Sequence, residues 1–490
     1  MKQAKRFFIA LLSFCLLGNM LVKADVTDDG FVYTEYSKLV RVTGYTGTAK
    51  SLVFPKINGK STVIATNFYL GVSNATEIEE IDLTNVSQVL SNAFVVYEDY
   101  DWESGDLENL YTFGFVNLKR AVIGDGITVN AGAFSGTTIT ELAFSGNTAS
   151  NVSGFASTVT TVDLSSVTTI GDAAFQGFIQ LQAIENFENV TSIGASAFSG
   201  CTGLTSIDLS NVTSIGTSAF RGCTGLTSID LSNVNTIGAS AFQNCGDAVS
   251  KMGLREVVWP EDLTVFPAYV FLGCAMLNSV TNLDKATEFG AYAFYNCSSL
   301  GGSYEFSNTL KSVGEDAFMG TNVTSVVFKS NPAIETNAFP AAVALNLVIE
   351  DKADFLNESD NVFDNVAYER TFTAGKFASL VLPFVPEQVK SGELEIFELK
   401  EARENDCLVF GQVPASEFRP GVPYLVKATT DISVLTCENA EVKCDMANTT
   451  LGDWTMIGQY ERLELIAANA PADRRYYYYV VEDNVLCSVN

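Results

Sequence analysis

The sequence predicts a repeat solenoid, mostly β with short irregular return arcs, followed by a C-terminal all-β sandwich-like domain. Two observations predict the solenoid. The segment CTGLTSIDLSNVTSIGTSAFRG begins at Cys201 and is almost repeated from Cys223, which sets a period of 223 − 201 = 22 residues. A small residue followed by phenylalanine also recurs, at Phe94, Phe134, Phe155, Phe175, Phe198, Phe220, Phe242, Phe271, Phe294, Phe318 and Phe339. Self-similarity at such a period is the signature of stacked structural repeats.

The first element is an export signal. Three basic residues precede an apolar run at residues 7–17, and a small residue, Ala24, stands at the expected cleavage position. We expect cleavage after Ala24, so that residues 1–24 are a signal peptide. A lipid anchor on Cys15 is the alternative, although Phe14 occupies a place where such sites need a small residue.

The remaining domains follow from where the period starts and stops. We expect an N-terminal β-rich cap at residues 25–63 and the solenoid at 64–350, with an insertion near 95–113 where two phenylalanine landmarks are widely separated. A cap or linker follows at 351–366. Beyond it, short apolar and aromatic runs are separated by Gly, Pro and Asn, which predicts a C-terminal β domain at 367–490.

Each repeat is expected to contribute one short strand to the solenoid. At residues 204–209, Ile207 and Leu209 flank Asp208, and strand side chains alternate between the two faces. Later apolar residues, including Phe220, turn the return arc inward. A single turn cannot bury these groups on both of its open sides, so stacking of the turns supplies the core.

The repeat pattern L-x-x-I-x-L-x-x-V-x-x-I-G-x-x-A-F-x-x-C resembles the BspA-like leucine-rich repeats of bacterial surface and secreted proteins, over about residues 64–348. The stretch at residues 30–60 resembles the β-rich cap that precedes such arrays. The resemblance implies a surface-exposed or secreted binding protein of the adhesin kind. It implies no particular ligand, because repeat scaffolds are reused for many partners.

Composition argues against several function classes. The chain has no histidine, which excludes a Ser-His-Asp triad and imidazole metal ligands. It has 29 Lys plus Arg against 57 Asp plus Glu, and the net charge of −28 argues against a nucleic-acid partner. No later stretch has the roughly 18 continuous apolar residues of a transmembrane segment. A P-loop, a GxGxxG motif and a nucleophile elbow are absent, so we expect neither enzyme activity nor a cofactor.

Acidic residues recur at the outward strand positions of four consecutive turns, at Asp163, Glu185, Asp208 and Asp230. Like charges on neighbouring strands destabilise each other. One interpretation is a carboxylate stripe that binds a basic protein segment or a cation. The alternative is a solvated face copied by repeat duplication, in which salt screens the repulsion.

Aromatic and acidic residues are mixed in the insertion, where Tyr97, Tyr100 and Trp102 lie among carboxylates. Such rings can stack on a sugar or accept a basic peptide. The alternative is a solvated loop whose aromatic residues fold back on the solenoid. An EF-hand calcium loop is not supported, because the required Gly and final Glu are out of place.

Cysteines form two groups. Five occupy equivalent positions of successive turns, at Cys201, Cys223, Cys245, Cys274 and Cys297, and we interpret them as buried free thiols rather than a metal or redox series. In the tail, Cys407, Cys437, Cys444 and Cys487 allow three pairings, and export permits oxidation. Cys437 with Cys444 is the easiest local disulfide.

Three functional hypotheses remain. The leading one is a non-enzymatic secreted or cell-surface binding protein that engages an extracellular protein or glycan through the solenoid face. The second is a structural spacer that presents a C-terminal β domain for binding or attachment. The third is a carbohydrate-active enzyme, which is weakly supported because no closed cleft is implied that would raise the pKa of one carboxyl group.

Overall fold

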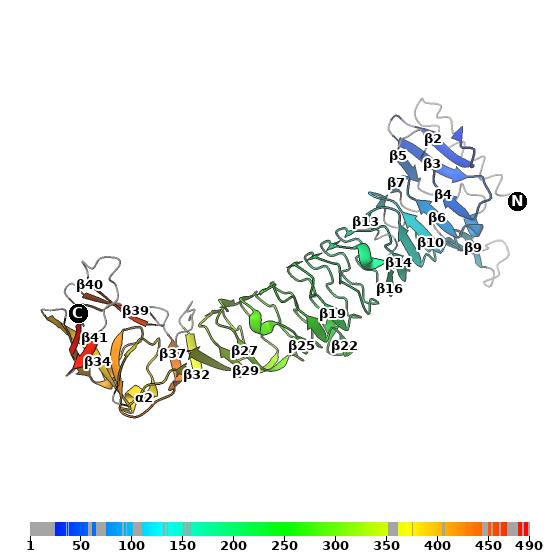
Figure 1. The fold of residues 1–490 in the computed structure, drawn as a ribbon. Coiled ribbons are helices and arrows are strands. Elements are labelled where there is room, and N and C mark those ends of the chain that lie inside the picture. Colours follow the sequence, from blue (N-terminus) through cyan, green and yellow to red (C-terminus); the bar gives the residue numbers. More distant parts are fainter. Residues whose placement is uncertain are drawn as a thin grey trace, which may run out of the picture. The chain divides into compact units, whose positions relative to one another are not determined.

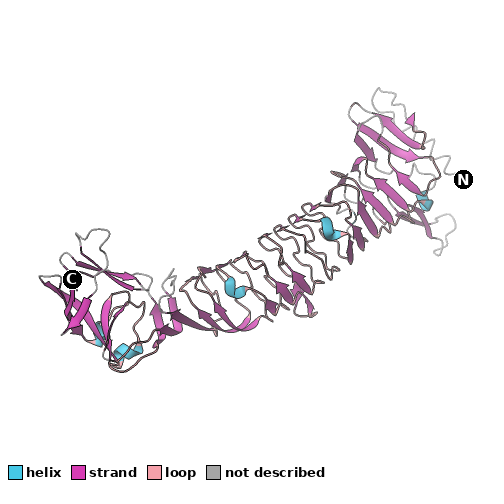
Figure 2. Ribbon diagram, in the orientation of Figure 1, coloured by secondary structure: helices cyan, strands magenta, loops and turns pink. Residues whose placement is uncertain are grey.

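The computed structural model describes residues 25–488 except 36, 38, 57–60, 65–74, 91–92, 95, 101–109, 131–132, 135, 150–151, 153–154, 156–157, 351–360, 375, 404–406, 443–448, 452–453, 460–461, 468–478 and 483–484. The chain divides into an N-terminal unit, residues 1–190, and a C-terminal unit, residues 191–490. In the described part of both units, short strands provide most of the regular structure, with a few helical turns between them (Figures 1 and 2). The predicted repeat solenoid is confirmed.

The N-terminal unit is built on two six-stranded sheets. The first has the strand order β1 (Asp25–Val26), β2 (Phe31–Glu35), β3 (Leu39–Tyr45), β5 (Ser61–Ile64), β7 (Val86–Val89) and β11 (Thr128–Val129). Its pairing is antiparallel from β1 to β3 and parallel from β3 to β11. The chain therefore changes from a hairpin arrangement to the stacked arrangement of the repeats within one sheet.

The second sheet of the N-terminal unit is parallel throughout. Its order is β4 (Ser51–Val53), β6 (Glu80–Leu83), β10 (Arg120–Ile123), β12 (Glu141–Phe144), β14 (Thr161–Asp163) and β16 (Ala183–Glu185). Smaller elements are an antiparallel hairpin and a parallel pair, formed by β8 (Val96–Tyr100) with β9 (Leu110–Gly114) and by β13 (Thr148–Ala149) with β15 (Thr169–Ile170).

The C-terminal unit continues the same construction with three sets of short parallel strands. These are β17 (Ser192–Ile193), β18 (Ser214–Ile215) and β20 (Thr236–Ile237); β19 (Ser228–Asp230), β23 (Glu256–Val258) and β25 (Ser279–Val280); and β24 (Val265–Phe266), β26 (Glu288–Phe289), β28 (Ser312–Val313) and β30 (Ala333–Ile334). The short insertion at residues 247–253 contributes an antiparallel hairpin, β21 (Gly246–Asp247) with β22 (Met252–Gly253).

Stacked phenylalanine rings form the core of this unit. Phe220 lies between Phe198 and Phe242, with ring centroids 5.3 and 5.4 Å apart and ring planes within 8° of parallel. All three side chains are fully buried. The stack continues through Phe271, Phe294, Phe318 and Phe339. The landmark that reveals the period in the sequence is thus the residue that joins one turn to the next.

The glycine of the repeated Ile-Gly pair is required by close backbone approach. A Cβ atom on Gly216 would lie 2.6 Å from the backbone nitrogen of Ala195, and one on Gly238 would lie 2.4 Å from that of Thr217. Any larger residue would force adjacent turns apart. The sequence pattern at this position therefore follows from the spacing of the turns.

The last strands of the array merge with the C-terminal β domain. One sheet contains β27 (Gly301–Phe306), β29 (Asn322–Phe328), β31 (Ala344–Glu350), β32 (Asn361–Glu369) and β37 (Leu435–Val442). Pairing is parallel as far as β32, whereas β37 adds antiparallel to it. A strand from the tail thereby covers the open edge of the array, and β32 runs across residues 366 and 367, where the sequence suggested the start of the C-terminal domain.

The rest of the tail is all-β, as predicted. Its larger sheet has the order β33 (Phe377–Leu380), β36 (Tyr424–Ala428), β34 (Leu394–Arg403), β35 (Cys407–Val413), β42 (Val485–Ser488) and β41 (Tyr479–Glu482). A smaller antiparallel sheet holds β38 (Thr449–Leu451), β39 (Trp454–Gln459) and β40 (Arg462–Ala467). The short helix α2 (Glu387–Lys390) lies against β37, where Thr436 and Gln388 exchange two hydrogen bonds.

Candidate functional site

The carboxylates predicted to form a stripe begin as a pair in the N-terminal unit. Asp163 at the end of β14 lies directly opposite Glu185 at the end of β16. Asp163 is half-buried and Glu185 is exposed. The Asn186 side-chain amide donates to Asp163 Oδ1 at 2.9 Å, and the backbone N–H of Ser165 donates to the same oxygen at 3.0 Å. The Asn186 hydrogen bond is the main reason that the pKa of Asp163 lies below its ordinary value.

In the C-terminal unit, Asp208 and Asp230 are exposed and each closes a local turn. The backbone N–H of Ser210 donates to Asp208 Oδ1 at 3.0 Å, and that of Ser232 donates to Asp230 Oδ1 at 2.9 Å. This is the Asx turn that aspartate side chains form with backbone two residues on. The Ser210 hydrogen bond also lowers the pKa of Asp208. One oxygen of each carboxylate is used by the fold, and the charge still faces solvent.

The row of acidic residues ends at Asp230, because the residue paired with it on the next strand, β23, is not acidic. Asp230 lies opposite Val258, whose side chain is 41% exposed. Asp208 precedes β19 and belongs to no strand of the described residues. A hydrogen bond of 2.8 Å from the Asn233 amide to the Ser210 carbonyl oxygen links its turn to that of Asp230. The ligand-binding role of these carboxylates stays a prediction.

The aromatic insertion forms the β8–β9 hairpin, in which Tyr97 pairs with Phe113 and Tyr100 with Leu110. Trp102 and the side chains of both tyrosines lie outside the described residues. Their predicted contact with a ligand therefore stays a prediction.

The five repeat cysteines are buried free thiols, as predicted. Four of them donate a hydrogen bond to the phenylalanine carbonyl oxygen of the preceding turn, at 2.9 to 3.1 Å, namely Cys223, Cys245, Cys274 and Cys297. In the tail, the buried Cys437 thiol lies 3.9 Å from Glu387 Oε1, and its predicted disulfide partner Cys444 lies outside the described residues.

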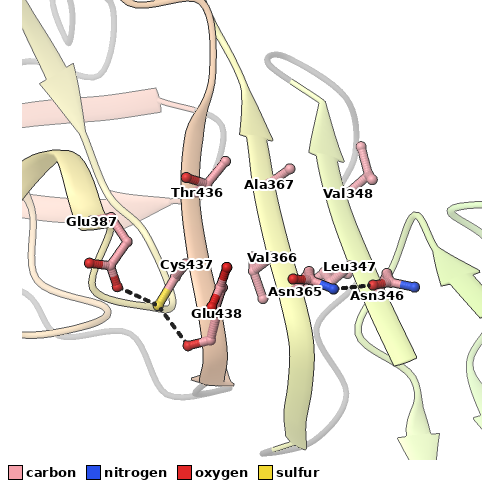
Figure 3. Close-up of a pocket in the computed structure, with 10 residues that line it drawn as sticks. All are labelled: Asn346, Leu347, Val348, Asn365, Val366, Ala367, Glu387, Thr436, Cys437 and Glu438. Carbon is pink, nitrogen blue, oxygen red and sulfur yellow. Dashed lines mark hydrogen bonds between the residues drawn. The ribbon is translucent and has the colours of Figure 1, made fainter. Parts of the chain in front are cut away.

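A cavity of about 620 Å³ lies where the array meets the tail, a site that the sequence did not reveal (Figure 3). Its lining comes from β31, β32, β37 and α2: Asn346, Leu347, Val348, Asn365, Val366, Ala367, Glu387, Thr436, Cys437 and Glu438. Leu347, Val366 and Cys437 are buried, whereas Asn365 and Glu438 are exposed. Strand alternation places the buried row and the polar row on opposite faces of the sheet. The groove therefore has a polar row, Asn346, Asn365 and Glu438, along one register of the sheet.

Backbone contacts fix the orientation of the asparagine amides in this groove. Asn346 Nδ2 lies 3.2 Å from the Val326 carbonyl oxygen, which can only accept. Asn346 must therefore turn its oxygen toward Asn365, whose Nδ2 donates to it at 2.8 Å. Figure 3 shows this bond between the two strands. Asn365 is left with its amide oxygen facing away from Asn346, as an acceptor.

Two hydrogen-bond acceptors, the amide oxygen of Asn365 and the carboxylate of Glu438, consequently lie on neighbouring strands. Asn365 lies directly opposite Glu438 in the β32–β37 register. Lys390 makes an ion pair with Glu387 at 2.7 Å, whereas Glu438 has no basic partner within the described residues. An amide oxygen beside an uncompensated carboxylate is suited to an ammonium, a guanidinium or a hydroxyl donor. Asn346 interrupts the apolar run of β31, but β32 holds other polar residues such as Asp364, so the sequence carries no distinct signal for the groove.

Other kinds of site are not found in the described part of the chain. No three His, Cys, Asp or Glu residues there gather where they could hold a metal ion. Among the same residues, no helix has the length and apolar character needed to cross a membrane.

The repeats match a known family. The family model of the BspA-type leucine-rich repeat region, in six copies, matches residues 153–250 and 248–346. Residues 153–346 form a BspA-type leucine-rich repeat region. Asp163, Glu185, Asp208 and Asp230 all lie within the BspA-type region, and the groove lies at its C-terminal end.

Solved structures similar to this chain are bacterial repeat proteins. A leucine-rich repeat protein from Bacteroides ovatus is 19% identical, covering 66% of this chain and 99% of its own, with a TM-score of 0.36. The pneumococcal vaccine antigen PcpA is 13% identical, covering 67% and 94%, with a TM-score of 0.32. A leucine-rich cell surface protein from Faecalibacterium prausnitzii is 16% identical, covering 62% and 96%, with a TM-score of 0.22. At these values none of the three likenesses carries an argument about function. No curated protein sequence matches the chain.

Proposed function

We propose that the protein is a non-enzymatic secreted or cell-surface binding protein whose solenoid face contacts an extracellular protein or glycan. The BspA-type region supports a surface binding protein. The observation that carries the proposal is that Asp208 and Asp230 are held by their own turns, exposed, and without a basic partner among the described residues. Fixed and uncompensated charge on an open face favours shallow contact with a basic partner, and the net charge of −28 speeds the encounter.

A double substitution in the full mature chain tests this role. Asn keeps the Asx turn, because its side-chain oxygen accepts the same hydrogen bond, so Asp208→Asn with Asp230→Asn removes charge without removing the turn. The matched control is Glu288→Gln with Glu335→Gln, which removes equal charge from two other exposed residues, one in β26 and one directly after β30. Binding to a panel of immobilised matrix proteins and neutral glycans is measured at low and high salt.

We expect the aspartate pair to weaken binding at low salt more than the control pair does, and high salt to reduce the difference. Equal loss in both variants would show that only the overall field matters. Unchanged binding in the aspartate variant would refute the carboxylate role.

The spacer hypothesis is favoured by a separate observation, the acceptor-lined groove at the junction with the tail. In that case binding belongs to the C-terminal β domain, and the solenoid positions it. Glu438→Gln removes the uncompensated carboxylate of the groove. Loss of binding in this variant, with no loss in the aspartate pair, would favour the spacer hypothesis.

Export is the second part of the proposal. Cleavage after Ala24 would leave Asp25, the first residue of β1, as the mature N-terminus. N-terminal sequencing of the protein recovered from the culture medium or the cell surface tests this. An N-terminus at Met1, or at Cys15 with a lipid attached, would contradict it.

A further inference from the structure

One position in every turn of the C-terminal unit has a left-handed backbone conformation. It is occupied by Ser196, Ser218, Ser240, Tyr269, Tyr292, Asp316 and Asn337, with φ between 53° and 61°. Backbone hydrogen bonds keep these positions in register: the Ser240 N–H donates to Ala268 at 3.0 Å, and the Tyr269 N–H donates to Ala291 at 2.9 Å. The side chains of neighbouring turns therefore stand next to each other in one row.

Tyrosine is unexpected at this position. Small polar residues tolerate the left-handed region, whereas bulky side chains rarely adopt it. Tyr269 has φ 61° and Tyr292 has φ 59°, so the fold accepts the strain in two consecutive turns. Strained backbone of this kind is concentrated at functional sites. Two tyrosines in a row that otherwise consists of serine, aspartate and asparagine thus call for a reason other than stability.

The two tyrosines form a rigid aromatic platform. Their rings are parallel within 3°, and their centroids are 5.2 Å apart. The interaction of the Tyr292 hydroxyl with the Asp316 carboxylate is the main reason that the pKa of Tyr292 is raised. Tyr295 packs against Tyr292 at 5.4 Å with an angle of 58°. The orientation of Tyr292 is held from two sides, and Tyr269 stacks on it.

The other ring face of Tyr269 is open. The next residue in the row is Ser240, whose side chain is too small to cover an aromatic ring. Tyr269 is 39% exposed, and its ring has no second aromatic contact among the described residues. A third ring in the stack would occupy the space above Ser240. On that side of Tyr269 the row therefore offers the hydroxyl group of Ser240 and no ring.

We propose that the open face of Tyr269 binds the apolar face of a neutral hexopyranose ring of a glycan, which takes the place of the missing third ring. A pyranose ring is flat, with C–H groups on its faces and hydroxyl groups at its rim, so it can stack on tyrosine while it hydrogen-bonds to Ser240. The net charge of −28 disfavours an anionic sugar. Because the platform is already ordered, little conformational entropy is lost on binding. This inference rests on the proposed binding function and names one of its sites.

The test uses the full mature chain and the methyl glycosides of glucose, galactose and mannose at millimolar concentration. Binding is measured by saturation-transfer NMR, which reports the sugar protons closest to the protein. Tyr269→Ser introduces the residue found at the preceding positions of the row and should therefore fold. Tyr295→Gln is the matched control, because Gln243 stands at the equivalent position of an earlier turn and Tyr295 offers no face to the space above Ser240.

We expect at least one glycoside to bind with saturation of its ring C–H protons, and Tyr269→Ser to weaken that binding about tenfold. Tyr295→Gln should bind like the wild type. The melting temperature of Tyr269→Ser should equal or exceed that of the wild type, because serine relieves the strain. Tyr292→Phe, which keeps the ring but removes the hydroxyl that interacts with Asp316, should weaken binding by a smaller factor.

Absence of binding by the wild-type chain, or equal affinity in Tyr269→Ser, would overturn the proposal. Either result leaves the proposed function to be judged by the aspartate pair, because Asp208 and Asp230 do not belong to the tyrosine row. Weakened partner binding in the aspartate variant, with no effect of Tyr269→Ser, would remove the glycan platform alone.

Discussion

The thiol of Cys223 donates a hydrogen bond to the backbone carbonyl oxygen of Phe198, 3.0 Å away in the preceding turn. Cys245 makes the same contact with Phe220 at 2.9 Å. Each cysteine thereby fixes its own turn to the one before, beside the phenylalanine stack that joins the same turns. The cysteine ladder is a structural device of the repeat, which explains why it has the period of the core.

The burial of these thiols predicts that the folded protein loses stability at alkaline pH. Burial raises the pKa of Cys223, Cys274 and Cys297 above the ordinary value. The unfolded thiols ionise from about pH 8.5, whereas the folded ones stay protonated. Stability is therefore unaffected by these groups below about pH 8.5 and falls as pH rises above it, by up to about 1.4 kcal/mol per thiol and pH unit. Urea unfolding between neutral and alkaline pH measures the slope.

The control for this prediction is the triple replacement of the same cysteines by serine. Serine does not ionise in this range, so the slope above pH 8.5 should become shallower. An unchanged slope would mean that other groups cause the alkaline loss.

The phenylalanine stack predicts a large effect of a single truncation. Phe220 is fully buried between two parallel rings, and Phe220→Ala should lower the free energy of unfolding by about 3 to 5 kcal/mol. The exposed Arg221→Ala is the neighbouring control and should change it by less than about 0.5 kcal/mol. Denaturant unfolding of both variants measures the difference. A loss below about 1 kcal/mol for Phe220→Ala would contradict the role of the stack.

The Asx turn at Asp208 separates the structural role of a carboxylate from its charge. Asp208→Ala removes the acceptor for the Ser210 N–H and should cost about 1 kcal/mol, whereas Asp208→Asn retains the acceptor and should cost less. Because the Ser210 bond lowers the pKa of Asp208 in the folded state, its contribution is present above the unfolded pKa and is lost as pH falls through the folded one. Melting temperatures at neutral and acidic pH test both statements. Equal loss in the two variants would show that the turn does not contribute.

The period and the core could be predicted from the sequence because the same residues produce both. A phenylalanine equivalent to Phe220 recurs in successive turns, and its burial follows from the stacking of the turns. The groove could not be predicted, since Asn365 and Glu438 become neighbours only through the antiparallel pairing of β32 with β37. Long-range pairing of this kind leaves no periodic trace. The Tyr269 platform does leave a sign in the sequence, because one repeat position changes from serine to tyrosine. That change can be interpreted only once the backbone conformation at this position is known.

Strand register also predicts a disulfide in the C-terminal β domain. Cys407 of β35 lies directly opposite Cys487 of β42 in an antiparallel pair. Directly opposite residues have Cβ atoms about 4.5 to 5.5 Å apart on the same face, within reach of a cross-strand bridge after small adjustment. Oxidation of this pair would leave Cys437 for Cys444, the local pairing expected from the sequence. Both bridges require an oxidising compartment, which the proposed export would provide.

Peptide mapping of the secreted protein without reduction tests the register argument. We expect one peptide pair that joins Cys407 to Cys487, while the buried repeat thiols, such as Cys223, are alkylated only after unfolding. Cys407→Ser should abolish the bridge and lower the melting temperature, whereas reduction should have no further effect on that bridge in the variant. A mature, exported protein in which both Cys407 and Cys487 carry the alkylating label in the native state would show that the register does not lead to a disulfide.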